Sequence, residues 1–454
     1  SFAHIGTQMK GRAMCEVFGA YGWAEGTPVM KWLLDYLLVR GVNHFVPHAF
    51  SPAFPDPDCP PHFGAEGVDP QFEGFSKLMS YGNRAAHLLS HGVHIADAAI
   101  LYHADAEWYG EYGTAMLTQV PAKILYDEHI DFDIIPADCF TGDSGSRVYP
   151  AKVSDGRLRI GDEVYGCLIV PAADKLPQKL EKALSALEDA GVCVIRMEKD
   201  GSKEDLIKRV DCAAERDIRV DGDHPFLRCI HYRNGVSHTY MFVNESVADP
   251  VDTTVTLLSL DGCRSGVMLD MLNDGVYSVS TVNGRLPLSL SPYQSVIAVF
   301  DPEGAPADLP QRPQYTKIPC GLTFSVAKAP YTNMEKYTPL PGEYPSGTLP
   351  DISADDPGFS GRIRYTCRFD RPDGVSGIDL GEVGQTAHLY CNGADLGVRV
   401  CPPYSYDLSR CLKDKDNELV IEISNTLANA VRDGFSTFLA IPASGIKGPV
   451  NWLK

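Results

Sequence analysis

The first 84 residues combine short apolar runs with one amphipathic segment. Residues 11–20 and 42–50 are typical of buried strands. Between them, residues 27–41 place apolar side chains at helical spacing, with Thr27 as the predicted N-cap and Gly41 as the predicted C-cap. Strand, helix and strand in this order form one βαβ unit, which is the repeating element of a parallel barrel or a doubly wound sheet.

The α/β rhythm continues from residue 85 to about residue 215. The predicted strands lie within 95–103, 131–140, 165–173 and 192–197, and the predicted helices lie within 112–130 and 176–191. The strand within 165–173 is apolar on both faces, as expected where helices cover both sides of a parallel sheet. The pattern predicts a flavodoxin-like open parallel sheet.

From residue 216 to 305 the apolar positions change to a period of two. The alternating runs lie at 238–246, 251–260, 275–282 and 294–301. Short strands with Gly, Asn and Asp turns between them predict an antiparallel β-sandwich.

A proline-rich linker opens the last region, 306–454, where the alternation returns. Its apolar runs include 361–370, 386–400 and 417–426. Asn392 and Gly393 predict a tight hairpin turn inside the second of these runs. The region is expected to form a jelly-roll sandwich, so the whole chain is multidomain, with α/β parts followed by all-β parts.

Charge and cysteine usage narrow the class of partner. The net charge is −19 and the sequence has no basic patch, which argues against nucleic acid and anionic membrane surfaces as partners. No run of 18 apolar residues is present that would predict a membrane span. The 13 cysteines are scattered and form no C-x-x-C pair, which favours free thiols in a reducing cytoplasm. The start at Ser1 leaves a periplasmic or secreted location open, because a leader could have been removed.

Glu16 is the candidate catalytic residue because it closes the first apolar run. Catalytic carboxylates of barrel enzymes lie at the carboxyl ends of parallel strands. Tyr21 and Trp23 follow within seven residues, and aromatic faces match the C–H faces of a sugar ring. The alternative is that Glu16 is a solvated turn residue, which residue type and spacing alone favour.

The next strand supplies three further candidates for substrate binding, Asn43, His44 and His48. His48 ends this strand, so its ring is expected to reach the same mouth as Glu16. Hydrogen-bonded core or rim histidines are the alternative. Asp56 and Asp58 in the following loop form an oxygen pair suited to a hard cation, but their spacing lacks the glycine and terminal glutamate of an EF-hand loop, and solvated acids on a rigid proline loop are favoured.

These segments together resemble a known enzyme family. The run CEVFGAYGW, followed by a helix and GVNHFVPHAFSP with PPHFG, resembles the last two strand–helix units of the barrel in α-L-rhamnosidases of glycoside hydrolase family 106. The middle region is similar to the flavodoxin-like domain of that family and to the β-galactosidase trimerisation domain. The ending, from LYCNGADLG to SGIKGPV, resembles a family 2-type sugar-binding jelly roll.

The resemblance implies a glycoside hydrolase in which Glu16 is a catalytic carboxylate. Family 106 enzymes are inverting and associated with calcium, which would make Glu16 the general base. Only about 80 residues precede the flavodoxin-like region, whereas a barrel needs about 250. We therefore expect residues 1–84 to be the end of a barrel in a longer enzyme and to pack on the flavodoxin-like domain or on another copy of the chain.

A second interpretation belongs to a different class of protein. The chain would be a non-catalytic carbohydrate-binding or assembly module that binds oligosaccharide through its jelly roll. An amidotransferase-like activity of the flavodoxin-like region is disfavoured, because no Cys or Ser elbow follows any of its strands. Under either of the two main interpretations the expected ligand is a glycoside or oligosaccharide, and a homo-oligomer is possible.

Overall fold

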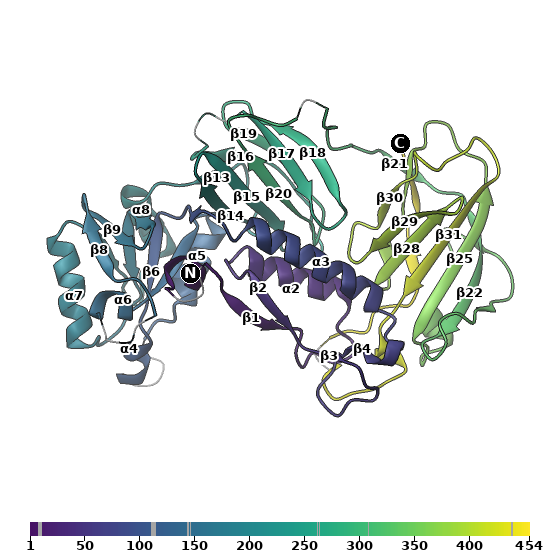
Figure 1. The fold of residues 1–454 in the computed structure, drawn as a ribbon, viewed down its shortest axis with the longest axis horizontal. Coiled ribbons are helices and arrows are strands. Elements are labelled where there is room, and N and C mark those ends of the chain that lie inside the picture. The colour runs from purple at the N-terminus through teal and green to yellow at the C-terminus, as the bar shows by residue number, and fades with distance from the viewer. Residues whose placement is uncertain are drawn as a thin grey trace.

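The computed structural model describes residues 1–7, 11–109, 115–142, 145, 147–260, 262, 264–306, 308–436 and 439–454. Figure 1 shows an α/β domain at the left, a β domain at the top and a second β domain at the right, with two long helices between them. The structure thus combines α/β and all-β domains, which agrees with the expectation of a multidomain chain of these two classes. Across the described ranges no helix is long and apolar enough to cross a membrane.

Strands β1 and β2 of the N-terminal region pair in parallel. The elements of this region are α1 (Phe2–Ile5), β1 (Met14–Val17), α2 (Thr27–Leu38), β2 (His44–Pro47), β3 (Phe50–Ser51), β4 (Phe63–Gly64), the 3-10 turn Ala65–Gly67 and α3 (Phe72–Leu88). The β1–β2 register runs from Met14 opposite His44 to Val17 opposite Pro47. These two strands form a sheet of their own, so the described residues do not close a barrel.

The start of α2 differs from the sequence expectation. Gly26, rather than Thr27, is the N-cap, and no side chain caps the helix. The Thr27 hydroxyl instead donates to the Val400 carbonyl, 2.8 Å away, because a contact with the C-terminal domain replaces local capping. Val39 is the C-cap, and Gly41 follows two residues later with a φ of +84°.

The α/β domain contains a four-stranded parallel sheet. Its elements are β6 (Ala98–Tyr102), α4 (Ala104–Tyr109), α5 (Gln119–Asp127), β7 (Phe132–Pro136), α6 (Asp138–Thr141), β8 (Ala151–Ser154), β9 (Arg157–Ile160), β10 (Glu163–Tyr165), β11 (Cys167–Val170), α7 (Gln178–Asp189), β12 (Cys193–Arg196) and α8 (Lys203–Ala213). The order β7–β6–β11–β12 matches the first four strands of a flavodoxin-like sheet. The helix expected over 112–130 is shorter, and 112–114 lie outside the described residues. The antiparallel sheet β8–β9–β10 was not predicted.

The middle β domain consists of two antiparallel sheets packed face to face. Its strands are β5 (Val93–His94), β13 (Ile218–Val220), β14 (Leu227–Asn234), β15 (Ser237–Asn244), β16 (Val251–Leu257), β17 (Ser265–Asp270), β18 (Gly275–Ser280), β19 (Arg285–Leu290) and β20 (Ser295–Phe300). One sheet has the order β18–β17–β20–β15–β14–β5 and the other β13–β16–β19. β5 lies within the predicted flavodoxin-like region, 85–215, but pairs with β14. It therefore belongs to the sheet of the middle β domain.

The C-terminal β domain is also built from antiparallel sheets. Its elements are β21 (Lys317–Pro319), β22 (Thr323–Pro330), β23 (Thr338–Pro339), β24 (Tyr344–Pro345), α9 (Ile352–Asp355), β25 (Gly361–Phe369), β26 (Gly377–Asp379), β27 (Glu382–Val383), β28 (Thr386–Cys391), β29 (Ala394–Arg399), β30 (Ser405–Asp407), β31 (Asn417–Ser424), the 3-10 turn Leu427–Asn429, β32 (Ile446–Gly448) and β33 (Asn451–Leu453). The predicted turn at Asn392 and Gly393 has φ angles of +50° and +79°, which fit a hairpin turn with both central residues at positive φ.

One apolar core joins the N-terminal region to both β domains. Leu34 of α2 and Leu78 of α3 are fully buried together with Met241 of β15 and Val400 beside β29. The N-terminal region also contacts the α/β domain: Ile5 enters its core, and the Arg40 guanidinium lies 4.9 Å from the Tyr126 ring centroid. Residues 1–84 therefore pack on both β domains as well as on the expected flavodoxin-like domain. Helix α3 also runs through the expected boundary at residue 84.

Candidate functional site

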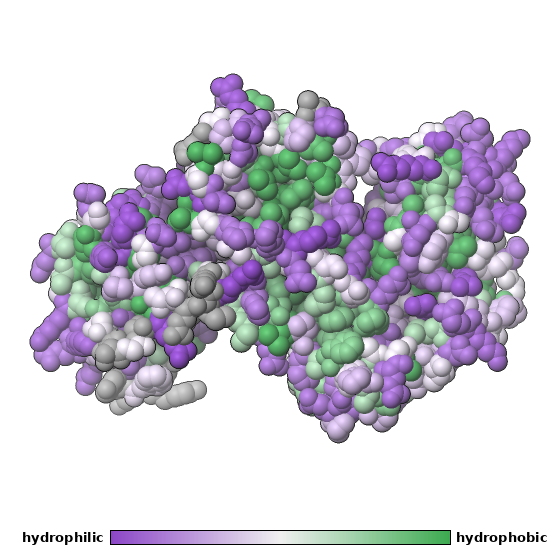
Figure 2. Space-filling view, viewed as in Figure 1, coloured by the Kyte–Doolittle hydropathy of each residue, from purple (hydrophilic) through white to green (hydrophobic). Residues whose placement is uncertain are grey.

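The open face of the β1–β2 pair carries the candidate carboxylate. Glu16 is exposed on β1 beside Met14, and His44 and Val46 are exposed on the same face of β2. The opposite face, which includes Val17, packs against α2 and α3, because successive side chains of a strand alternate between faces. Figure 2 shows apolar surface in the lower centre, where Figure 1 labels β1 to β4.

His48 lies beside Glu16 at the carboxyl ends of the two strands. A Cβ built on Gly19 would lie 3.2 Å from Glu16 Oε1 and 3.4 Å from His48 Cβ, so both side chains flank the same glycine. His48 Nε2 lies 3.3 Å from Asp58 Oδ2 and 3.8 Å from Cys59 Sγ. The structure therefore brings Glu16 and His48 together as predicted, and adds an acid and a thiol from the β2 exit loop.

The loop after β2 holds Asp58 in a fixed orientation. Asp56 accepts hydrogen bonds from Ser51 Oγ at 2.5 Å and from the Asp58 backbone at 2.9 Å. Asp58 Oδ1 accepts a bond from the Cys59 backbone at 2.8 Å, and this bond lowers the pKa of Asp58. Oδ2 of Asp58 therefore remains directed toward His48.

No group of three carboxylates that would suit calcium, which the family resemblance implies, occurs among the described side chains. Two clusters of three potential metal-ligating side chains occur in the described ranges, one around His48 and one around His4. Each contains a single carboxylate, whereas calcium takes six to eight oxygen ligands. The paired use of Asp56 and Asp58 for a hard cation is not supported either, because Asp56 is hydrogen-bonded within its own turn.

Tyr21 and Trp23 lie in different environments. Tyr21 is 38% exposed, whereas Trp23 is 7% exposed and packs edge-to-face on Phe54, with ring centroids 6.2 Å apart. The Trp23 backbone donates to Asp433 Oδ2 at 3.1 Å, so the C-terminal domain fixes this turn. Of the two predicted sugar-facing aromatics, only Tyr21 is presented to solvent.

Asn43 and His44 also separate. The buried Asn43 side chain accepts from the Ala13 backbone at 3.0 Å and donates to the Gly11 carbonyl at 3.0 Å and the Leu89 carbonyl at 3.4 Å. It ties the entry of β1 to the start of β2, at the opposite end from His48. His44 is exposed on the open face. It lies opposite Met14, two residues before Val46, which is the residue opposite Glu16.

Glu25 and His62 are buried polar residues near the site that the sequence did not single out. Neither carboxyl oxygen of Glu25 has a hydrogen-bond partner, and burial raises the pKa of Glu25 to about 9. His62 Nε2 and His48 Nδ1 are likewise buried without a partner. Gln385 of the C-terminal domain lies against Gly26, next to Glu25. The burial of Glu25 therefore depends on a domain distant in sequence, and no local sequence pattern could reveal it.

A second histidine–carboxylate cluster lies where α1, β5 and β7 meet. His4 Nδ1 lies 2.8 Å from Asp133 Oδ1, and His94 Nδ1 lies 3.1 Å from Asp133 Oδ2. The remaining ring nitrogens are also bonded, His4 Nε2 to the Tyr232 hydroxyl at 2.9 Å and His94 Nε2 to Asp131 Oδ2 at 2.8 Å. Every ring nitrogen in this cluster therefore has a protein partner.

Burial and charge assign different protonation states to the two histidines. Burial lowers the pKa of His4 to about 4 despite the nearby Asp133 carboxylate. Burial also opposes the charged form of His94, but the carboxylates of Asp131 and Asp133 outweigh it and raise the pKa of His94 well above its ordinary value. A neutral His4 and a cationic His94 satisfy all the hydrogen bonds without a metal ion.

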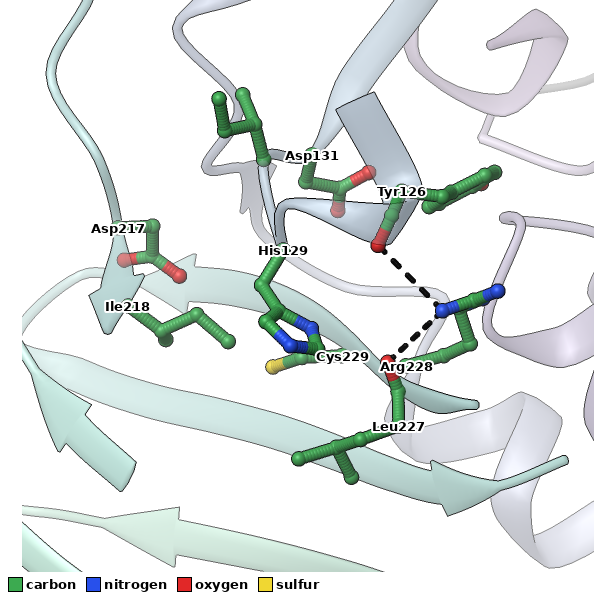
Figure 3. A pocket seen from close by; sticks show the side chains of 9 residues that line it. Tyr126, His129, Asp131, Asp217, Ile218, Leu227, Arg228 and Cys229 are labelled. Carbon is green, nitrogen blue, oxygen red and sulfur yellow. Dashed lines mark hydrogen bonds between the residues drawn. The ribbon is translucent and has the colours of Figure 1, made fainter. Parts of the chain in front are cut away.

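Two cavities adjoin this domain junction. The larger, of about 670 Å³, lies beside Phe132 and is lined by Tyr36, Tyr126, Arg40 and Arg228. In the smaller one, Figure 3 shows Arg228 donating to the carbonyls of Tyr126 and Leu227, at 3.4 and 3.1 Å. Arg40 and Arg228 are both paired with Glu245, so these cations connect the domains rather than stand free.

One solved structure shares the fold of this chain. No family model matches the chain, and no curated protein matches its sequence. A rhamnosidase from Novosphingobium sp. PP1Y superposes on 97% of this chain with a TM-score of 0.69 and 17% identity. This chain has the fold of one part of that rhamnosidase. It spans 47% of the rhamnosidase chain.

Other solved glycoside hydrolases are more distant in structure. A catalytic mutant of a family 42 β-galactosidase from G. stearothermophilus has a TM-score of 0.40 and 8% identity, over 61% of this chain and 51% of that one. A β-glucuronidase from Ruminococcus gnavus has a TM-score of 0.20 and 17% identity, over 25% of this chain and 22% of that one.

Proposed function

We propose that this chain is part of a glycoside hydrolase that cleaves a terminal deoxysugar glycoside, such as an α-L-rhamnoside, and that Glu16 is a catalytic carboxylate. The observation that carries the proposal is the placement of Glu16, exposed at the end of a parallel strand and beside His48. The fold shared with a rhamnosidase supports the same assignment. An exposed carboxylate beside a histidine can accept a proton from water or attack a sugar carbon.

The residues around Glu16 suit a sugar. The exposed ring of Tyr21 offers an apolar face to the C–H groups of a pyranose. The exposed His44 can exchange hydrogen bonds with hydroxyl groups from the same face. In an inverting reaction Glu16 would be the general base, and in a retaining one the nucleophile.

A second carboxyl group is needed for this chemistry, at about 5–5.5 Å in retaining and about 6.5–9.5 Å in inverting enzymes. We assign it to further strand–helix units that would extend the β1–β2 sheet. The two strands have unpaired outer edges in the part of the chain that the structure describes. The exposed Met14 and Val46 beside Glu16 are apolar side chains that such units would cover.

The proposal is tested by Glu16→Gln in the full-length gene product, assayed on a panel of aryl glycosides that includes the α-L-rhamnoside. Loss of the carboxylate should lower kcat by roughly 10²- to 10⁴-fold on the substrate that the natural enzyme prefers. Glu198→Gln, the same change at an exposed carboxylate on the α/β domain, should leave kcat unchanged. Normal hydrolysis by the Glu16→Gln enzyme would refute the assignment.

A non-catalytic role in carbohydrate binding is the second candidate, and one groove of the C-terminal domain favours it. Tyr337, Arg364 and Glu422 line this groove together with Tyr390 and Arg362. The Arg364 guanidinium stacks 3.6 Å from the Tyr337 ring centroid and pairs with Glu422 at 2.6 Å. Planar polar groups beside aromatic rings can bind sugar hydroxyls and C–H faces together.

Calorimetry of the chain with oligosaccharides tests this second role. Binding that Tyr390→Ala weakens, with no turnover in the natural full-length protein, would favour the binding module. Absence of oligosaccharide binding would count against it.

A further inference from the structure

His48, Asp58 and Cys59 present three different ligand atoms to one point in space. His48 Nε2, Asp58 Oδ2 and Cys59 Sγ all lie within 4.8 Å of one another. The imidazole comes from the end of β2, and the carboxylate and the thiol come from adjacent positions in its exit loop. An imidazole, a thiol and a single carboxylate are ligands of zinc-class cations, whereas calcium and magnesium take oxygen ligands.

The spacing of these atoms matches a tetrahedral metal site. Bonds of about 2.0 Å to nitrogen and oxygen and about 2.3 Å to sulfur place N and O about 3.3 Å apart, and N and S about 3.5 Å apart. The observed separations from His48 Nε2 are 3.3 Å to Asp58 Oδ2 and 3.8 Å to Cys59 Sγ. These two separations are within a few tenths of an ångström of the tetrahedral values, and Asp58 Oδ2 and Cys59 Sγ lie within 4.8 Å of each other.

The converging atoms are hydrogen-bonded to one another, and further hydrogen bonds hold the loop that carries Asp58 and Cys59. Asp58 Oδ1 is occupied by the Cys59 backbone, which leaves Oδ2 for the cluster. Asp56 accepts from the Asp58 backbone and from Ser51 and so fixes the loop. His48 Nδ1 is buried without a partner, so this ring has no competing hydrogen bond that would turn Nε2 away.

We propose that His48 Nε2, Asp58 Oδ2 and Cys59 Sγ bind one divalent cation of the zinc class, with a fourth position open to water or a ligand. The Asp58 side chain is 65% exposed, which leaves an entry path. Three protein ligands and one open position are the arrangement of catalytic rather than structural zinc sites.

The site adjoins the candidate catalytic carboxylate, because His48 and Glu16 flank Gly19. A bound cation would fix the His48 ring and the β2 exit loop relative to Glu16. The proposal does not depend on glycoside hydrolysis, since metal binding is measured on the chain without any substrate. Failure of one proposal therefore leaves the other standing.

The test is a titration of the metal-free chain with Co²⁺, followed by absorption, and with Zn²⁺, followed by calorimetry. We expect one saturable site and a thiolate-to-cobalt charge-transfer band. Cys59→Ser should abolish the band, and Asp58→Asn should weaken zinc binding by roughly 10- to 100-fold or more, since losing even an outer-shell partner costs that much. Because the Asp58 side chain is exposed, the Asp58→Asn variant should fold normally. It therefore keeps the proposal testable even if Cys59→Ser disrupts the fold.

Cys193→Ser is the matched control, because Cys193 is an exposed free thiol on the α/β domain. It should keep both the band and the zinc affinity. No saturable binding of either metal by the natural chain would overturn the proposal. Unchanged binding in both Cys59→Ser and Asp58→Asn would overturn it as well, and so would saturable calcium binding without a thiolate band.

Discussion

Two histidine–carboxylate clusters in this molecule contain similar side chains but differ in how their polar atoms are satisfied. Around Asp133, every ring nitrogen of His4 and His94 has a protein partner, and the side chains are almost fully buried. Around His48, one ring nitrogen has no partner and the Asp58 carboxylate is exposed. The saturated cluster joins domains, whereas the open cluster includes an exposed carboxylate that a ligand can reach.

The difference follows from how deeply the charged groups of each cluster are buried. Burying charged groups costs several kcal/mol per ion unless partners compensate, so a buried cluster at a domain junction has to be complete. A cluster at the mouth of two strands can leave atoms to water or a ligand. Incomplete hydrogen bonding beside Glu16 is therefore the more informative sign of function. This holds although the pKa of Asp133 lies well below its ordinary value, because His4 and His94 outweigh the effect of burial.

The largest expected effect is on stability, from Asp133→Asn. The change leaves the cationic His94 without one of its two carboxylate partners, and breaking a buried pair typically costs about 3–5 kcal/mol in free energy of unfolding. Asp58→Asn in the open cluster should cost far less, because the side chain is largely exposed. Urea unfolding of both variants checks the contrast. Equal losses would show that the clusters are not different in kind.

The same contrast applies to the two aromatic residues near Glu16. Trp23→Ala should destabilise the chain by about 3 kcal/mol, because it empties a packed site between the N-terminal region and the C-terminal domain. Tyr21→Ala should change stability by less than about 0.5 kcal/mol and should raise KM in the full-length enzyme. A stable Trp23→Ala protein with a raised KM would instead place Trp23 at the sugar.

A smaller effect should appear in the pH dependence of the free energy of unfolding, through the Glu25 carboxyl group. Its folded-state pKa of about 9 lies above the ordinary value of 4.5, so between those values the native state holds a proton that the unfolded state has released. Stability should therefore fall as pH rises from 4.5 toward 9. Glu25→Gln removes this dependence, and its stability relative to the natural chain should increase by about 1–3 kcal/mol between pH 5 and pH 8.

Urea unfolding at the two pH values measures this difference. Glu198→Gln, at an exposed carboxylate, should show no such gain. A constant difference between the natural chain and the Glu25→Gln variant across this range would mean that Glu25 is already ionised in the folded protein.

Periodicity alone was sufficient to predict much of the fold. The strand around Glu16, the helix after it and the alternating strands β15, β16, β20, β25 and β31 were all expected, because each has a local apolar pattern of the right period. The short strands β8 to β10 were missed, since three or four residues carry too little pattern. The N-cap of α2 was misassigned because Thr27 bonds to Val400, which is distant in sequence.

The site was predictable only in part. Glu16 and His48 could be placed together because both end parallel strands. The contact of Cys59 with His48 was not predictable, because it depends on the course of the exit loop, which brings together residues eleven positions apart. The burial of Trp23 and Glu25 depends on Asp433 and Gln385 of the C-terminal domain, and no local pattern contains that information.

The most direct test of the central claim is kcat per folded molecule for Glu16→Gln and Asp133→Asn, measured side by side in the full-length gene product on its preferred aryl glycoside. We predict that Glu16→Gln keeps the natural unfolding midpoint and loses roughly 10²- to 10⁴-fold in kcat, whereas Asp133→Asn unfolds earlier and keeps a near-natural kcat. A natural kcat in Glu16→Gln, or a matching loss in folded Asp133→Asn, would contradict the account.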